Sequence, residues 1–230
     1  MRDSLEIIPH VHQITNRGCN IILIVEEELT LIDTGLRDSS SKIVSLIHNL
    51  GRSVEEISLI IITHNHLDHV GGLPELRNLT TAKIAIHKAD INEGELTYPR
   101  VVQKLLHTPS FSTFRPLVYA KSNEVDIQLN GNEVLSPLGG LKVIHTPGHT
   151  PGSISLFSPQ KKLFIAGDAL NNLYNIRPPL KLISTDLPQA IDSIKRIARL
   201  DFDTLCFGHG RPLAKNASAK VQGLIKKQGL

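Results

Sequence analysis

The stretch LIIITHNHLDHV, residues 59–70, places four potential metal ligands directly after an apolar run. The run predicts a buried strand, and the four ligands follow its end. In an extended segment, residues two apart point the same way, so His64 and His66 are predicted to share one metal ion. Asp68 and His69 point away from that pair as the chain turns. They are predicted to serve a second ion nearby.

Further candidate ligands follow other predicted strands. His149 lies in the loop TPGHTPG, residues 146–152. Asp168 follows the apolar run 163–165, and His209 stands in the segment FGHG after the last predicted strand. Loops at the ends of separate strands can converge on one cleft, so these side chains are predicted to complete the site.

Short apolar runs separated by turn residues predict a layered protein with both helices and strands. The predicted strands span residues 20–25, 29–33, 58–63, 132–136, 141–145, 154–158, 163–167 and 204–207, and the predicted helices span residues 39–50, 187–200 and 218–228. Strands cluster in each half of the chain with helices between them. We therefore expect two sheets packed together with helices outside.

The composition narrows the class of protein. The 230 residues include 40% apolar but only 4% aromatic side chains, which indicates a core of Ile, Leu and Val. A net charge of +3, with the basic residues dispersed, does not favour nucleic-acid binding, and none is expected. The two cysteines form no disulfide framework, and Cys206 is predicted to be an inert core thiol. Without a secretory pattern or an apolar run of membrane-spanning length, we expect a cytoplasmic protein without membrane contact.

One segment, residues 94–123, shows no clean periodicity. It contains Pro99, Pro109 and Pro116 together with several aromatic residues. Two interpretations are open: an irregular surface insertion, or a substrate flap over a pocket, because long loops without regular structure are often functional.

The motifs occur in an order that resembles a known family. LIDTG at residues 31–35 precedes HxHxDH, and TPGHTPGS, GD at 167–168 and GHG at 208–210 follow. This set, spread over residues 20–212, resembles the metallo-β-lactamase superfamily. The resemblance implies a single domain over residues 1–230 with an α+β fold, a four-layer αββα sandwich that carries its metal site at one edge.

The resemblance also implies which side chains hold metal. Two ions would be held by seven residues: His64, His66 and His149 for the first, Asp68, His69 and His209 for the second, and Asp168 as a bridge between them. Asp33 would orient one of the ligands. The ions are expected to be two divalent cations, zinc first, with iron and manganese as alternatives, because mixed His and Asp ligation suits all three.

With this site, the sequence predicts a binuclear metal-dependent hydrolase acting on a small molecule. A hydroxide bridging the two ions would attack a carbonyl carbon, and Asp68 would take up the proton of the nucleophile. Aspartate stands at position 168, where the lactamases have cysteine or serine, so the chain resembles the glyoxalase II-like and lactonase-like branches. A thioester, a lactone and an ester all remain candidates for the bond that is cleaved. Lactonases of the family use a tyrosine near the bridging aspartate, and Tyr174 is the candidate here.

Other activities of the family stay open. A persulfide dioxygenase-like enzyme would hold a single iron with two histidines and an aspartate, which leaves His66 and His209 without a role. An RNA-processing nuclease would need an RNA-binding arm, and the sequence shows none. A non-catalytic binding module would be expected to have lost ligands. The oligomeric state is open, a homodimer included.

Six further histidines lie outside these ligand assignments. His145, four residues before His149, is predicted at most as an accessory group. The other five are expected at the surface or in packing: His10, His12, His48, His87 and His107.

Overall fold

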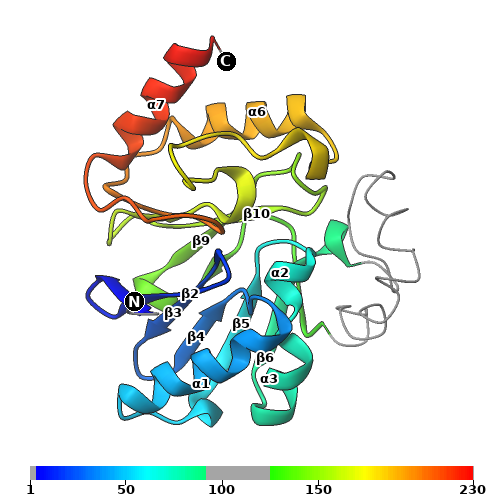
Figure 1. Cartoon of the computed structure of the whole chain (residues 1–230), viewed down its shortest axis with the longest axis vertical. Helices are drawn as coiled ribbons and strands as arrows, with labels where there is room; N and C mark the ends of the chain where they lie inside the picture. Colours follow the sequence, from blue (N-terminus) through cyan, green and yellow to red (C-terminus); the bar gives the residue numbers. More distant parts are fainter. Residues whose placement is uncertain (1–3, 92–124, 230) are drawn as a thin grey trace.

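A computed structural model describes residues 4–91 and 125–229 of the chain. Two β-sheets lie face to face, with helices α1 and α3 outside one sheet and α6 and α7 outside the other (Figure 1). This is the four-layer αββα arrangement that the sequence predicted. The segment 94–123, interpreted above as an insertion or a flap, falls within residues 92–124 and lies outside the described residues.

The first sheet has seven strands among the described residues, in the order in which they occur along the chain. They are β1 (Ser4–Ile8), β2 (Val11–Asn16), β3 (Cys19–Val25), β4 (Leu29–Ile32), β5 (Ile57–Ile62), β6 (Lys83–His87) and β7 (Ile127–Leu129). Pairing is antiparallel from β1 to β4 and parallel from β4 to β7.

In the described parts of the chain, the second sheet has five strands in the order β12-β11-β10-β9-β8. They are β8 (Val134–Leu135), β9 (Leu141–His145), β10 (Ile154–Ser158), β11 (Leu163–Ile165) and β12 (Thr204–Cys206). Only β11 and β12 pair in parallel. The carboxyl ends of these two strands therefore lie at the same edge of the sheet.

The described α-helices are α1 (Ser40–Asn49), α2 (Leu67–Val70), α3 (Leu73–Leu79), α6 (Leu187–Ile197) and α7 (Ala217–Gln228). Short 3-10 turns are η1 (Arg37–Ser39), η2 (Val54–Glu56), η3 (Lys88–Asp90), η6 (Pro137–Gly139), η7 (Gly167–Ala169) and η8 (Lys181–Ile183). Among the described residues, no helix is long and apolar enough to cross a membrane.

Three apolar clusters correspond to the three interfaces between the four layers. One joins α1 and α3 to the first sheet, through residues such as Ile43 and Ile60. A second lies between the sheets and includes Ile61 and Leu156, and a third joins α6 and α7 to the second sheet. The successive residues Ile60 and Ile61 of β5 thus face different layers, which explains why residues 59–62 are all apolar.

Most predicted elements are confirmed within a few residues, but four strands were missed: β1, β2, β6 and β7. β1, β2 and β7 are interrupted by polar residues, so their periodicity is weak. The predicted strand 163–167 is too long. It ends at Ile165 because Gly167 has φ +53°, which turns the chain into η7 and places Asp168 at the sheet edge.

Truncating a side chain between the two sheets tests whether their packing stabilises the protein. Leu156 is fully buried in the cluster that joins the two sheets. We expect Leu156→Ala to lower the free energy of unfolding by about 2–5 kcal/mol, measured by urea denaturation, because truncation leaves a cavity. Val134→Ala is the control, since Val134 is 62% exposed on β8, and it should change the free energy by less than about 0.5 kcal/mol. Equal effects would contradict this assignment of the core.

Candidate metal centre

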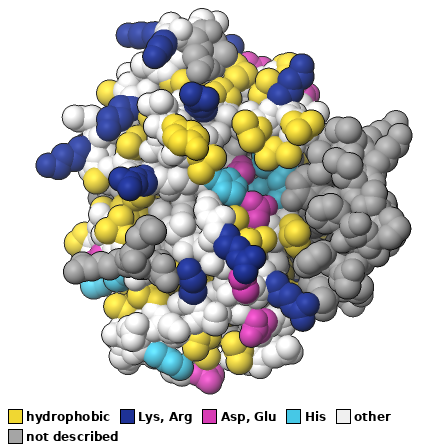
Figure 2. All heavy atoms as spheres, in the orientation of Figure 1, with side chains coloured by type: hydrophobic (Ala, Val, Ile, Leu, Met, Phe, Trp, Pro, Cys, Tyr) yellow, Lys and Arg dark blue, Asp and Glu magenta, His cyan; other side chains and the backbone are white. Residues whose placement is uncertain are grey.

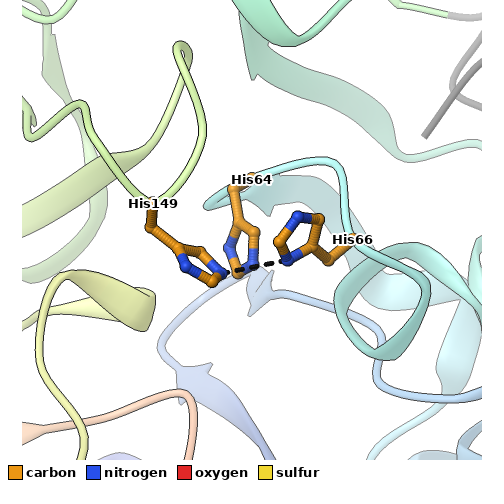
Figure 3. Close-up of side chains that lie close together, drawn as sticks. All are labelled: His64, His66 and His149. Atoms are coloured by element: carbon orange, nitrogen blue, oxygen red, sulfur yellow. Dashed lines mark hydrogen bonds between the residues drawn. The ribbon is translucent and has the colours of Figure 1, made fainter. Parts of the chain in front are cut away.

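His64, His66 and His149 form the first group of donors (Figure 3). One ring nitrogen of each lies within 4.8 Å of the others, and His149 Nε2 lies 3.0 Å from His66 Nδ1. The rings come from two loops, one after β5 and one between β9 and β10. Three imidazoles that meet in this way are a donor set typical of zinc sites.

The turn after β5 corrects one part of the sequence interpretation. His64 and His66 were expected to point the same way because the segment is extended. Instead the backbone N–H of His66 donates to the carbonyl of His64 at 3.1 Å, so the chain bends tightly between them. The rings still meet, with centroids 4.7 Å apart. The turn brings them together, and strand alternation does not.

Asp68, His69 and His209 form the second group. Asp68 and His69 lie on the short helix α2, and His209 follows β12. Asp68 Oδ2 lies 3.2 Å from His209 Nε2 and 3.8 Å from His69 Nε2. The side chain of Asp68 is 29% exposed, whereas that of His69 is fully buried, so the carboxylate of Asp68 stands nearer to solvent.

Asp168 lies between the two groups. Its Oδ2 is 3.5 Å from His149 Nε2 and 3.3 Å from His209 Nε2, and its Oδ1 is 3.6 Å from His69 Nε2. Gly208 leaves room for this carboxylate, because a Cβ at position 208 would lie 2.1 Å from Asp168 Oδ1. All seven side chains that the sequence singled out therefore lie together at one edge of the sandwich.

Outer hydrogen bonds fix the orientation of two rings through a single carboxylate. His69 Nδ1 donates to Asp33 Oδ2 at 2.8 Å. Thr63 Oγ1 also donates to Asp33 Oδ2, so the lone pair of Thr63 faces His64 Nδ1 at 3.0 Å. With each Nδ1 occupied, the Nε2 atoms of His64 and His69 are left facing the site.

The same pattern holds for two other rings. His149 Nδ1 lies 3.1 Å from Ser184 Oγ, whose hydroxyl donates to the carbonyl of Leu180. His209 Nδ1 donates to the carbonyl of Gly18 at 3.0 Å. Protein groups thus hold the Nδ1 atoms of four of the five histidines, and their Nε2 atoms converge.

Asp90 is a residue of the site that the sequence interpretation missed. Its buried carboxylate accepts hydrogen bonds from the backbone of Asn65 at 3.0 Å, the hydroxyl of Thr150 at 2.6 Å and the backbone of Gly152 at 2.7 Å. It therefore ties the loop of His64 and His66 to the loop of His149. The only signal in the sequence was a carboxylate shortly after strand β6, and that strand had not been predicted.

Burial controls the charge of the first group. Desolvation lowers the pKa of His64 well below its usual value and also lowers that of His149. Both rings are therefore neutral near pH 7, the form in which imidazole binds metals.

In the second group, ionised carboxylates and protonated histidines stabilise each other. Burial alone would raise the pKa of Asp68 and Asp168, but the adjacent His69 and His209 keep both below the usual range. Burial alone would lower the pKa of His69, but Asp33, Asp168 and Asp68 raise it to about 9. In the metal-free protein, protons on the histidines of this group supply positive charge beside the carboxylates. A bound cation would replace these protons, so metal binding would release them.

Buried polar atoms without a hydrogen-bond partner indicate whether these residues fit a metal ion. His64 Nε2, His69 Nε2 and Asp168 Oδ1 are buried and make no hydrogen bond among the described residues. Leaving such atoms unpaired costs about 1–3 kcal/mol each. His64, His69 and Asp168 also offer donor atoms within 4.8 Å of one another. The arrangement therefore fits bound cations, and nitrogen and oxygen donors of this kind suit zinc, iron or manganese.

The other candidate residues lie outside these groups. The ring of His145 stacks on that of His87 with centroids 4.1 Å apart, and its Nε2 donates to the carbonyl of Pro151. Cys206 is fully buried in the core, where desolvation raises its pKa to about 12. Tyr174 is 90% exposed. His10 and His48 are exposed, His12 is partly buried, and His107 lies outside the described residues.

Comparisons with known proteins show the family and the fold. The sequence profile of the metallo-beta-lactamase superfamily matches residues 14–209. A probable metallo-hydrolase of Bacillus subtilis, YflN, is 26% identical and covers 94% of this chain and 90% of its own. A hydroxyacylglutathione hydrolase of Bartonella tribocorum is 28% identical over 86% of this chain and 66% of its own. The crystal structure of the metallo-beta-lactamase family protein TTHA1429 from Thermus thermophilus superposes with a TM-score of 0.75 at 21% identity, covering 97% of this chain and 81% of that one.

The hydrogen bonds that Asp33 accepts predict that its loss weakens metal binding. In Asp33→Asn, a single amide oxygen must replace a carboxylate that receives three hydrogen bonds. We expect zinc to bind about 10–100-fold more weakly, measured by competition with a chromophoric chelator, because partners behind metal ligands typically contribute this much. The control is Asp38→Asn, which removes an exposed carboxylate paired with Arg17. Unchanged zinc affinity in Asp33→Asn would show that His69 does not need this partner.

Proposed function

Because this chain belongs to the metallo-β-lactamase superfamily, we propose that it is a binuclear hydrolase of small molecules that cleaves a carbonyl ester-type bond. The bond is a thioester, a lactone or an ester. The observation that carries the proposal is Asp168, whose two oxygens face donors of both groups. Two cations held on either side of one carboxylate are typical of hydrolytic centres.

The chemistry divides between the cations and the chain. Two bound divalent ions, zinc first, would polarise the carbonyl group and lower the pKa of a water molecule to about 7. Asp68 stands where its partly exposed carboxylate would take up the proton that this water loses. Asp33 and Ser184 hold His69 and His149 in orientation, so the donor atoms need no rearrangement.

The relatives support this class of reaction. One relative is named a hydroxyacylglutathione hydrolase and another a probable metallo-hydrolase. A single-iron centre that uses two histidines and an aspartate would leave His66 and His209 without a function. Both side chains lie within the two donor groups, which favours the binuclear alternative.

A segment beside the site carries apolar side chains that solvent reaches. Four of the exposed large hydrophobic residues lie between positions 173 and 182: Leu173, Tyr174, Leu180 and Leu182. The start of this segment is tied to His209, since the N–H of Asn172 donates to the carbonyl of His209. Its end reaches Ser184 beside His149. Figure 2 shows apolar side chains bordering the exposed histidine and acidic side chains on this face. Such a border suits a substrate with an apolar acyl group or ring.

The proposal predicts that the chain binds two metal ions and that binding of both depends on the Asp168 carboxylate. Protein purified without chelator or histidine tag should contain close to two divalent ions per chain by elemental analysis, and chelation should abolish ester hydrolysis until zinc is restored. Asp168→Asn should hold at most one ion and lose hydrolysis, because it removes the charge between the two groups. Asp192→Asn, on the exposed face of α6, is the matched control and should retain both. A single iron per chain, with no second ion after reconstitution, would overturn the binuclear proposal in favour of a dioxygenase-like enzyme.

The apolar segment predicts a preference among substrates. Each methylene group that the segment shields from water contributes about 0.8 kcal/mol, so kcat/KM should rise about fourfold per added methylene along a series of straight-chain thioesters and esters. Leu180→Ser should flatten this dependence while leaving the metal content unchanged. Leu5→Ser, at an exposed site on β1, should not alter it. A series that is flat in the wild-type protein would exclude an apolar acyl substrate.

A further inference from the structure

Cys19 opens strand β3 and lies beside the second donor group. Its Sγ is 3.7 Å from Asp68 Oδ2, which in turn lies 3.2 Å from His209 Nε2. The three donor atoms lie within 4.8 Å of one another. Two donors on one zinc ion, at bond lengths of about 2.3 Å for sulfur and about 2.0–2.2 Å for oxygen or nitrogen, lie about 3–4 Å apart for bond angles of about 90–120°. The two measured spacings therefore fit donors to one cation.

The backbone around Cys19 is fixed against the loop of His209. The N–H of Asn20 donates to the carbonyl of Gly208, and its side-chain amide donates to the carbonyls of Phe207 and Gly210. Cys19 and His209 are paired in an isolated antiparallel bridge. Directly paired residues of an antiparallel pair project to the same face, so the sulfur and the imidazole lie side by side.

Other atoms at this position also point to a ligand. His69 Nε2 and Asp168 Oδ1 are buried without a hydrogen-bond partner among the described residues. The first lies 3.8 Å from Asp68 Oδ2, the carboxylate oxygen that Cys19 contacts, and 3.6 Å from the second. The sulfur therefore borders a position where buried donor atoms lack a hydrogen-bond partner among the described residues.

We infer that Cys19 is a further ligand of the second metal position and that its sulfur biases this position toward zinc and against manganese. The inference rests on the binuclear centre of the proposed function. Binding breaks the S–H bond, forms a metal–sulfur bond and releases one proton to the solvent, with no change of oxidation state. Thiolate is a soft ligand that suits zinc, whereas manganese prefers oxygen donors.

The alternative is a thiol that only donates a hydrogen bond to Asp68. Burial raises the pKa of the Cys19 thiol, so without a cation the sulfur keeps its proton. A coordinating thiol is deprotonated by the cation itself, whatever its pKa in the metal-free protein. Spectroscopy of the metal-loaded protein separates the two cases, because only a metal–sulfur bond gives a charge-transfer transition.

The test is a cobalt(II) titration of the metal-free full-length protein, followed by absorption and by counting the bound ions. The wild-type protein should develop a near-ultraviolet sulfur-to-cobalt band, and Cys19→Ser and Cys19→Ala should lose it. The chain has two cysteines, and both variants keep Cys206, so the loss assigns the band to Cys19. In zinc-loaded protein, Cys19→Ser should also release zinc from one of its two positions at a lower excess of manganese than the wild type does.

The outcomes separate this inference from the proposed function. Two cobalt ions per wild-type chain without a sulfur band would overturn the role of Cys19 and leave the binuclear hydrolase intact. One ion or fewer without a band would overturn both. A band that persists in Cys19→Ser would assign the sulfur to Cys206 and overturn the inference. Because the wild-type spectrum alone decides the first two cases, poor folding of a variant does not remove the test.

Discussion

A single buried carboxylate, that of Asp33, connects the fold to the metal centre. Asp33 ends β4 with φ +61°, and its N–H donates to the carbonyl of Ile61 on β5. Its side chain receives both hydrogen bonds of Thr63 and the Nδ1 proton of His69. Since Thr63 also contacts His64 Nδ1, one carboxylate orients a ring in each donor group. Aspartate tolerates the left-handed backbone that this geometry needs.

The sandwich supplies the rest of the centre by bringing strand ends together. Ligands follow β5, β9, β11 and β12, which belong to both sheets. The apolar cluster between the sheets sets their spacing, and Asp90 joins the loop after β5 to the loop after β9. The site is thus as rigid as the packing behind it. Its buried atoms without partners explain why folding and metal binding are expected to be coupled.

Local patterns were enough to predict most strands, the outer helices α1, α6 and α7, and all seven side chains that converge. They were not enough where a residue acts through contacts with residues that are distant in the sequence. Asp90 and Cys19 belong to no motif. Asp90, in the turn η3, faces the site only because the preceding strand β6 pairs with β5, and Cys19 only because β3 starts beside the loop of His209. The reason given for the meeting of His64 and His66 was also wrong: a tight turn after β5 brings the rings together, and Asp90, in η3, accepts a hydrogen bond from Asn65 within that turn.

The sequence by itself determined the kinds of donor, their order and their position at strand ends, because hydrophobic periodicity and ligand identity are local properties of the chain. It also determined the superfamily, through motifs spread over most of its length. Only the tertiary structure decided which nitrogen of each imidazole faces the site and that a cysteine stands beside the two donor groups. These features depend on hydrogen bonds and register between residues as many as 191 positions apart, and no local pattern encodes such distances.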